Sequence, residues 1–127
     1  MADILVIDDE PQIRRLMSRA LDGAGHKVVE AENGRVGLDR FMAYPFDAVV
    51  TDIVMPDVEG VELVRAIRTM SDVPILVITG SGRMKQLGFL DIAAHLGASD
   101  TLAKPFRMGV LVAAVERLLA PAAALVD

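Results

Sequence analysis

Short runs of β-branched and aliphatic residues alternate along the chain with longer segments in which apolar residues recur every three or four positions. Runs of the first kind indicate strands, and segments of the second kind indicate helices. The strands are expected at Ile4–Asp8, Lys27–Ala31, Ala48–Asp52, Pro74–Thr79 and Thr101–Ala103. Alternation of the two kinds of element predicts an α/β domain whose parallel sheet is covered by helices on both faces.

Amphipathic segments lie between these strands and after the last one. The first carries a single apolar stripe and ends at Gly23 and Gly25. The residues of that stripe are Ile13, Leu16, Met17, Ala20 and Leu21. The other helices are expected near Arg35–Met42, Val61–Arg68 with Leu63, Val64 and Ile67 buried, Gln86–Leu96, and Met108–Leu119. Short right-handed connections favour a doubly wound, five-stranded parallel sheet of the (βα)5 type with strand order 2-1-3-4-5.

Length and charge limit the function classes. The 127 residues fit one domain, and the 13 basic residues are scattered among 18 acidic ones, so the chain shows no basic face for direct contact with nucleic acid. The pair Arg14-Arg15 is interpreted as the solvated face of a helix. No apolar run reaches the roughly 20 residues that cross a bilayer, cysteine is absent, and no leader segment is expected. A cytoplasmic location without membrane contact is therefore expected.

Polar side chains stand where four of the predicted strands end. Asp8 and Asp9 follow the first apolar run, Asp52 the third, Thr79 the fourth and Lys104 the last. In a parallel sheet these ends share one edge, and the first and third strands are neighbours at the switch point where ligands bind. The sequence therefore predicts that three carboxylates, a hydroxyl and an ammonium group meet there.

Carboxylates packed this closely need a cation, and a hard divalent ion such as Mg2+ suits a site made of oxygen ligands alone. Each residue also has a plain structural explanation. Asp8-Asp9 could cap the helix that begins near Pro11, Asp52 could cap a turn, Thr79 could bond the backbone, and Lys104 could be a solvated surface charge. Complementary phosphate chemistry at all these strand ends favours one joint site.

The chain resembles the CheY-like receiver domains of response regulators in two-component signalling over essentially its whole length. The resemblance is carried by Val6-Ile7-Asp8-Asp9-Glu10-Pro11, Thr51-Asp52-Ile53-Val54-Met55-Pro56-Asp57-Val58-Glu59-Gly60, Thr79-Gly80, Gly97-Ala98-Ser99-Asp100 and Lys104-Pro105-Phe106. It implies a flavodoxin-like fold, a receiver domain over 1–120 and a short tail over 121–127. It also implies that Asp52 is the phosphoacceptor and that Thr79 and Lys104 contact the phosphoryl oxygens. The implied Mg2+ site is formed by Asp8, Asp9, Asp52 and the main-chain carbonyl of Val54, with Asp8 reaching the ion mainly through water, and Lys104-Pro105 resembles the family's cis peptide.

The resemblance further implies a signalling module rather than an enzyme. It would take a phosphoryl group from a histidine kinase or phosphotransfer protein and alter its contacts with a downstream effector protein. A homodimer through the region of the fourth and fifth helices is also implied, and the nearly continuous apolar run Val110–Val115 is explained either by such partner contact or by simple burial. Both a stand-alone regulator and a piece of a longer protein fit the sequence.

Two positions depart from the family pattern. Thr101 stands where receivers usually carry an aromatic switch residue, which suggests that rearrangement of Gly80–Gly88 carries the output instead. Val54 offers no polar side chain to orient an attacking water, which predicts a long-lived phosphoform.

Three alternatives to a phosphorylated receiver can be compared with these residues. A hydrolase of the haloacid dehalogenase type needs a second acid two residues after its nucleophile, and Val54 cannot serve as one. An FMN carrier of the same fold would suffer repulsion between the flavin phosphate and Asp8-Asp9-Glu10-Pro11. A degenerate receiver acting without phosphorylation is the third.

Overall fold

The computed structural model describes residues 1–52, 59–79 and 97–120. The strands in this part of the chain are β1 (Asp3–Ile7), β2 (Lys27–Ala31), β3 (Ala48–Asp52), β4 (Ile75–Thr79) and β5 (Asp100–Ala103). The helices are α1 (Pro11–Gly23), α2 (Gly34–Ala43), α3 (Glu59–Arg68) and α6 (Met108–Leu119). Each predicted strand is present with its ends displaced by at most one residue, and the predicted helices near 35, 61 and 108 are confirmed.

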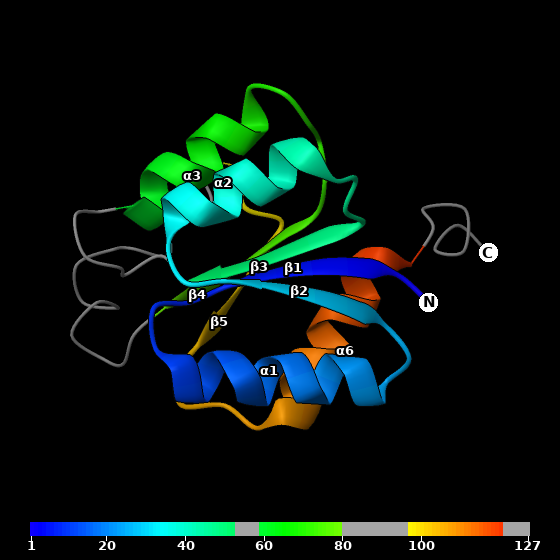
Figure 1. Cartoon of the computed structure of the whole chain (residues 1–127). Helices are drawn as coiled ribbons and strands as arrows, with labels where there is room; N and C mark the ends of the chain where they lie inside the picture. The colour runs from blue at the N-terminus through cyan, green and yellow to red at the C-terminus, as the bar shows by residue number, and fades with distance from the viewer. Residues whose placement is uncertain (53–58, 80–96, 121–127) are drawn as a thin grey trace.

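The five strands form one parallel sheet in the order β2-β1-β3-β4-β5, as the sequence predicts. Residues of β1 align with both neighbours, so that Ile4 lies opposite Val28 of β2 and Ala48 of β3. Because all strands run in one direction, their carboxyl ends lie along one edge, on the left in Figure 1. The amino-terminal strand begins at the opposite edge, close to the end of α6 (Figure 1).

Helices cover both faces of the sheet, with α2 and α3 on one face and α1 and α6 on the other (Figure 1). Successive side chains of a strand point to opposite faces. One core is accordingly built from Leu5, Ile7, Val49, Ile75 and Val77 of the strands with Leu63, Val64 and Ile67 of α3. The other contains Ile4, Val6, Val50, Leu76 and Ile78 with Met17 and Leu21 of α1 and Leu111, Ala114 and Val115 of α6. Burial on both faces explains the nearly continuous apolar runs of the central strands β1, β3 and β4.

Local sequence signals set the ends of the helices on either side of β2. α1 begins at Pro11, whose missing N–H would have no intrahelical partner there, and its chain leaves through Gly25 at φ 97°. α2 begins after Asn33, whose side-chain oxygen accepts a hydrogen bond of 2.8 Å from the N–H of Val36.

One packing expectation, for Leu16, needs correction, and of the two explanations for the apolar run in α6 complete burial is excluded. Leu16 is 51% exposed, because the buried side of α1 runs through Met17, Ser18 and Leu21 and leaves Leu16 beside it. α6 is not buried all round, since Val110 is 48% exposed while Leu111 and Val115 are fully buried. The apolar run in α6 therefore leaves part of its surface open, and partner contact there remains a prediction.

Several predicted features lie outside the described residues. These are the fourth helix at Gln86–Leu96, the segment Gly80–Gly88, Val54 and the tail at 121–127. Among the described residues, no helix is both long enough and apolar enough to cross a membrane.

Candidate functional site

Three carboxylates meet at the carboxyl edge of the sheet. Asp8 follows directly after β1, Asp52 ends the adjacent β3, and one carboxylate oxygen each of Asp8, Asp9 and Asp52 can be chosen so that all three lie within 4.8 Å of one another. Asp8 and Asp52 are buried at 0% and 3% exposure, whereas Asp9 is exposed. The structure thus confirms that the predicted acidic residues converge.

The backbone around Asp8 is held by the elements on both sides. Its N–H donates to the carbonyl of Ala31 at the end of β2 (3.1 Å), and its Oδ1 accepts from the N–H of Glu10 (2.9 Å). The N-cap residue of α1 is Glu10 and not Asp8 or Asp9, and the Glu10 side chain makes no capping hydrogen bond. The alternative in which Asp8-Asp9 serves as an ordinary helix cap is therefore wrong.

Lys104 reaches into this acidic cluster from the turn after β5. Its Nζ lies 2.9 Å from Oδ2 of Asp52, 3.5 Å from Oδ2 of Asp8 and 3.6 Å from Oε1 of Glu10. Only 18% of the lysine side chain is exposed, so the alternative of a solvated surface charge is wrong. The Lys104-Pro105 peptide is cis, as the resemblance implies.

Burial and neighbouring charges both shift the pKa values of Asp8 and Lys104. Burial is the main reason that the pKa of Asp8 rises from 3.8 to about 6, and the charge of Asp52 adds to the rise, while the Glu10 amide and Lys104 lower it. Burial alone would lower the pKa of Lys104, but its hydrogen bond to Asp52 and the charges of Asp52, Asp8 and Glu10 outweigh this and raise it. Lys104 is therefore held as an ammonium ion among carboxylates.

Thr79 occupies the same edge, next to the strand that carries Asp52. It is the last residue of β4, is 2% exposed, and pairs in register with Ala103 of β5. Its carbonyl accepts the N–H of Lys104 (2.9 Å), which ties the turn bearing the lysine to β4. Thr79 and Lys104, the predicted hydroxyl and ammonium residues, are thus joined by a main-chain hydrogen bond.

Arg14 shows where the sequence interpretation fails. Its guanidinium is not a solvated helix face, because Nη1 donates to the Asp8 carbonyl and Nε donates to Oε1 of Glu30, each at 2.9 Å, and only 15% of the side chain is exposed. Arg15, its neighbour, is exposed as predicted. The sequence signal for Arg14 is its place in the first turn of α1, directly after the acidic turn.

Thr101 lies in β5, opposite Val77 of β4, and is partly buried. Its N–H donates to the side chain of Asp100 (2.8 Å). The strand therefore has no aromatic side chain at the position three residues before Lys104.

The acidic cluster fits a hard divalent cation. Its ligand atoms are all carboxylate oxygens, two of its members are buried, and burial together with the nearby charge of Asp52 raises the pKa of Asp8. Mg2+ binds through one or two carboxylates, retains several waters and leaves positions for phosphate oxygens. Asp8, Asp9 and Asp52 could hold such an ion. Val54, the fourth predicted ligand, lies outside the described residues.

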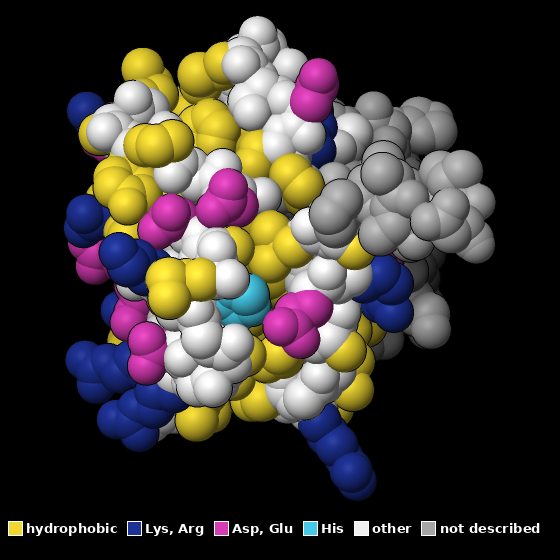
Figure 2. Space-filling model, turned by 90° about the vertical axis from the view of Figure 1, so that its right-hand side faces the viewer, with side chains coloured by type: hydrophobic (Ala, Val, Ile, Leu, Met, Phe, Trp, Pro, Cys, Tyr) yellow, Lys and Arg dark blue, Asp and Glu magenta, His cyan; other side chains and the backbone are white. Residues whose placement is uncertain are grey.

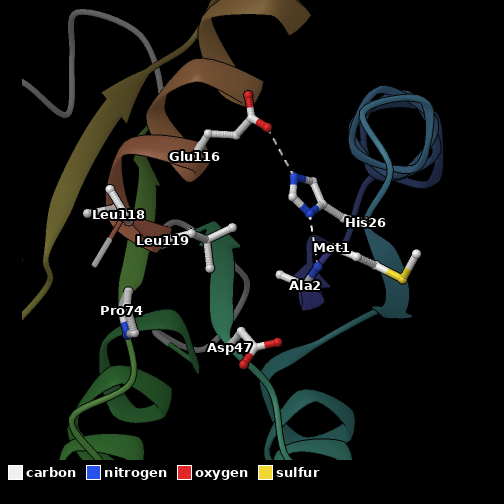
Figure 3. Close-up of a pocket in the computed structure, with 9 residues that line it drawn as sticks. Met1, Ala2, His26, Asp47, Pro74, Glu116, Leu118 and Leu119 are labelled. Carbon is white, nitrogen blue, oxygen red and sulfur yellow. Dashed lines mark hydrogen bonds and ion pairs between the residues drawn. The ribbon is translucent and has the colours of Figure 1, made fainter. Parts of the chain in front are cut away.

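A hollow of about 460 Å³ lies at the opposite end of the sheet (Figure 3). Two contacts hold the His26 ring in place there. Its Nδ1 accepts a hydrogen bond from the N–H of Ala2 (3.2 Å), and its Nε2 lies 3.4 Å from Oε2 of Glu116 (Figure 3). Figure 2 looks onto this end of the molecule, where hydrophobic and acidic side chains share the middle of the face. These groups form no cluster comparable with the one at the carboxyl edge.

Comparison with known proteins agrees with the site. Residues 4–116 match the model of the response regulator receiver domain family. The chain is 37% identical over 114 residues to the KDP operon transcriptional regulatory protein KdpE of Escherichia coli, covering 89% of this chain and 49% of that protein. It is 39% identical over 118 residues to the response regulator MprA of Mycolicibacterium vanbaalenii, covering 91% and 49%. The chain thus spans about half the length of these curated relatives.

Solved structures give the same result. The chemotaxis response regulator CheY4 of Vibrio cholerae superposes with a TM-score of 0.82 at 32% identity, covering 94% of this chain and 99% of that one. A response regulator receiver domain protein from Clostridium thermocellum gives a TM-score of 0.83 at 30% identity, with 94% of both chains covered. The comparisons give no support to a haloacid dehalogenase. With the fold, the carboxyl-edge cluster and the family match in agreement, the chain belongs to the response regulator receiver domains of two-component systems, which are signalling modules rather than enzymes in the usual sense.

Proposed function

We propose that Asp52 accepts a phosphoryl group from a histidine kinase or a phosphotransfer protein. The observation that carries this proposal is the 2.9 Å contact between the Lys104 ammonium and Asp52 inside a buried acidic cluster. A carboxylate is a weak nucleophile, so its reactivity depends on alignment and on neutralisation of the charge on the transferred group. Lys104 supplies a fixed positive charge for that purpose.

The transfer replaces one bond to phosphorus by another. A carboxylate oxygen of Asp52 attacks the phosphorus of a phosphohistidine, and the bond from phosphorus to the imidazole nitrogen breaks. That nitrogen keeps the electron pair and takes a proton from water. Asp8, Asp9, Asp52 and the carbonyl of Val54 would hold Mg2+, which when bound neutralises charge on the phosphoryl oxygens. Lys104 balances the remaining negative charge from its place beside Asp52.

Signalling then follows from a contact that exists only after transfer. The hydroxyl of Thr79, at the end of the strand next to Asp52, would donate a hydrogen bond to a phosphoryl oxygen. A contact made in one state alone shifts the balance between conformations. Because Thr101 stands in place of an aromatic residue, the conformational change reaches the partner surface without the ring movement usual in this family.

The wider biological role is also a proposal. We assign residues 1–120 to the receiver and 121–127 to a tail, and we place the protein in the cytoplasm. The relatives are named regulatory proteins and are about twice as long as this chain, which supports an effector protein or domain as the recipient of the signal. Homodimer formation through α6 and the predicted helix at Gln86–Leu96 is part of this proposal, as is the absence of direct nucleic-acid and membrane contact by this chain.

Intact mass spectrometry after incubation with acetyl phosphate and Mg2+ tests the phosphoacceptor. We expect a single phosphoryl adduct on the wild type that is absent from Asp52→Asn and is lost when EDTA removes the metal. Asp22→Asn, which changes an exposed aspartate of α1, should form the adduct as the wild type does. An adduct that persists in Asp52→Asn would contradict the assignment. No adduct under any condition would favour the degenerate receiver.

A further inference from the structure

The guanidinium of Arg14 joins three separate elements next to the acidic cluster. It projects from the first turn of α1, donates from Nη1 to the carbonyl of Asp8, and donates from Nε to the carboxylate of Glu30 in β2, both at 2.9 Å. Its side chain is 15% exposed, which is low for an arginine on a surface helix. The planar fork of arginine can satisfy two acceptors at once, which the single ammonium of lysine does less well.

Arg14 completes the restraint of Asp8 without touching its carboxylate. The N–H of Asp8 is bound to Ala31, its Oδ1 accepts from Glu10, and its carbonyl is bound by Arg14. Arg14 thus acts on the main chain of Asp8 and not on its carboxylate, and this backbone is fixed from two sides. Glu30 neutralises Arg14, so the contribution of the pair to the cluster is one of geometry more than of charge.

We propose that Arg14, held by Glu30, is a positioning residue that fixes the Asp8-Asp9 turn for binding a divalent cation. The inference rests on the part of the proposed function in which this cluster binds Mg2+. Mg2+ requires nearly ideal octahedral geometry, so a small displacement of one ligand weakens binding. Partners that orient metal ligands typically contribute about 10- to 100-fold in affinity.

The test compares Arg14→Met and Arg14→Lys with Arg15→Met, a matched control that removes the same charge from the exposed neighbouring residue. Isothermal titration with Mg2+ should give about 10-fold weaker binding or more for both Arg14 variants and a change below about 2-fold for Arg15→Met. At saturating Mg2+, the rate of adduct formation with acetyl phosphate should return to near the wild-type value in the Arg14 variants, since Asp52 and Lys104 are unchanged.

A second measurement needs no metal. In EDTA, the amide hydrogen of Glu10, which donates to Asp8, should exchange faster in Arg14→Met than in the wild type or in Arg15→Met. If Arg14→Met does not fold, Glu30→Ala removes the group that holds the guanidinium and should show the same two effects in weaker form.

Several outcomes would overturn the inference. Wild-type affinity in Arg14→Lys would mean that charge alone is needed at this position. Unchanged Mg2+ binding and unchanged Glu10 exchange in Arg14→Met would mean that the Asp8-Asp9 turn keeps its geometry without Arg14. If the wild type binds no Mg2+, the metal part of the proposed function fails together with the inference, whereas normal wild-type binding with unaffected variants removes the inference alone.

Discussion

The Nζ of Lys104 lies 2.9 Å from Oδ2 of Asp52, although the two residues are 52 positions apart in the chain. The contact depends on the parallel sheet, because Asp52 ends β3, β4 lies next to it, and the turn after β5 is tied to β4 through the bond from Lys104 N–H to the Thr79 carbonyl. The same ammonium lies 3.5 Å from Asp8. Lys104 is therefore the cation that offsets the carboxylates at this edge within the described residues.

Replacing Lys104 by Met should make the protein less stable when no divalent ion is present. The substitution removes the ammonium ion that contacts both Asp8 and Asp52, and breaking a largely buried ion pair costs up to about 3 kcal/mol at this degree of exposure. Urea unfolding in EDTA measures the loss, and added Mg2+ should restore part of it. Lys27→Met, at an exposed position in β2, is the control and should stay close to the wild type. Equal loss in the two variants would count against the role given to Lys104.

Asp8 should make folding stability depend on pH in the direction opposite to a typical salt-bridged carboxylate. Its pKa is raised to about 6 in the folded protein, so the folded state holds the proton more tightly than the unfolded state. The stabilisation of the folded state that comes from the proton on Asp8 is therefore fully present below pH 3.8 and is lost as the pH rises through about 6. Asp8→Asn should remove this component, which makes the variant more stable than the wild type in EDTA by at most about 3 kcal/mol at neutral pH.

Urea unfolding in EDTA at about pH 5 and about pH 8 checks this prediction, because the stability difference between wild type and Asp8→Asn isolates Asp8 from the other titrating groups. The advantage of the variant should grow with pH. A constant difference across this range would show that Asp8 titrates normally in the folded protein.

Most of the site was predictable from sequence because it follows from strand order. Apolar runs mark buried parallel strands, and parallel strands put Asp8, Asp52, Thr79 and Lys104 at one edge whatever lies between them. No detail of side-chain packing is needed for that step.

The direction of individual helix side chains was harder to predict. Periodicity places Leu16 in the apolar stripe and the charge pattern places Arg14 on a solvated face, yet Leu16 is 51% exposed and the Arg14 side chain 15% exposed. A long arginine stem can lie along the protein surface while its head reaches a polar partner, and the carbonyl of Asp8 offers that partner only once the turn before α1 has formed. The sequence pattern likewise gives Glu10 no role of its own, whereas in the structure its carboxylate lies 3.6 Å from Nζ of Lys104.

Gly37 should not tolerate a side chain, because α2 packs closely on β1. A Cβ at this position would lie 2.6 Å from Cδ1 of Ile7, which is fully buried. Overpacking of this kind costs about 1–3 kcal/mol, against a gain of about 1 kcal/mol from replacing a helical glycine by alanine. We expect Gly37→Ala to lower the unfolding free energy by about 1 kcal/mol in urea titrations. Gly109→Ala in α6, where the added carbon would meet no atom within 4 Å apart from its chain neighbours and the backbone of its own helix, should be neutral or stabilising. A similar loss there would argue against a steric cause.

Thr79 should be needed for the response to phosphorylation and not for the transfer itself. Thr79→Val keeps the shape of this buried side chain but removes the hydroxyl, whereas Thr79→Ser keeps the hydroxyl. Because Asp52 and Lys104 remain in contact, both variants should form the adduct at rates within about 10-fold of the wild type, with stability changed by about 1 kcal/mol. Amide hydrogen exchange with and without acetyl phosphate should differ in the wild type and in Thr79→Ser, while Thr79→Val should show little difference. A full exchange response in phosphorylated Thr79→Val would mean that the conformational change is driven by charge at Asp52 without a hydrogen bond from this residue.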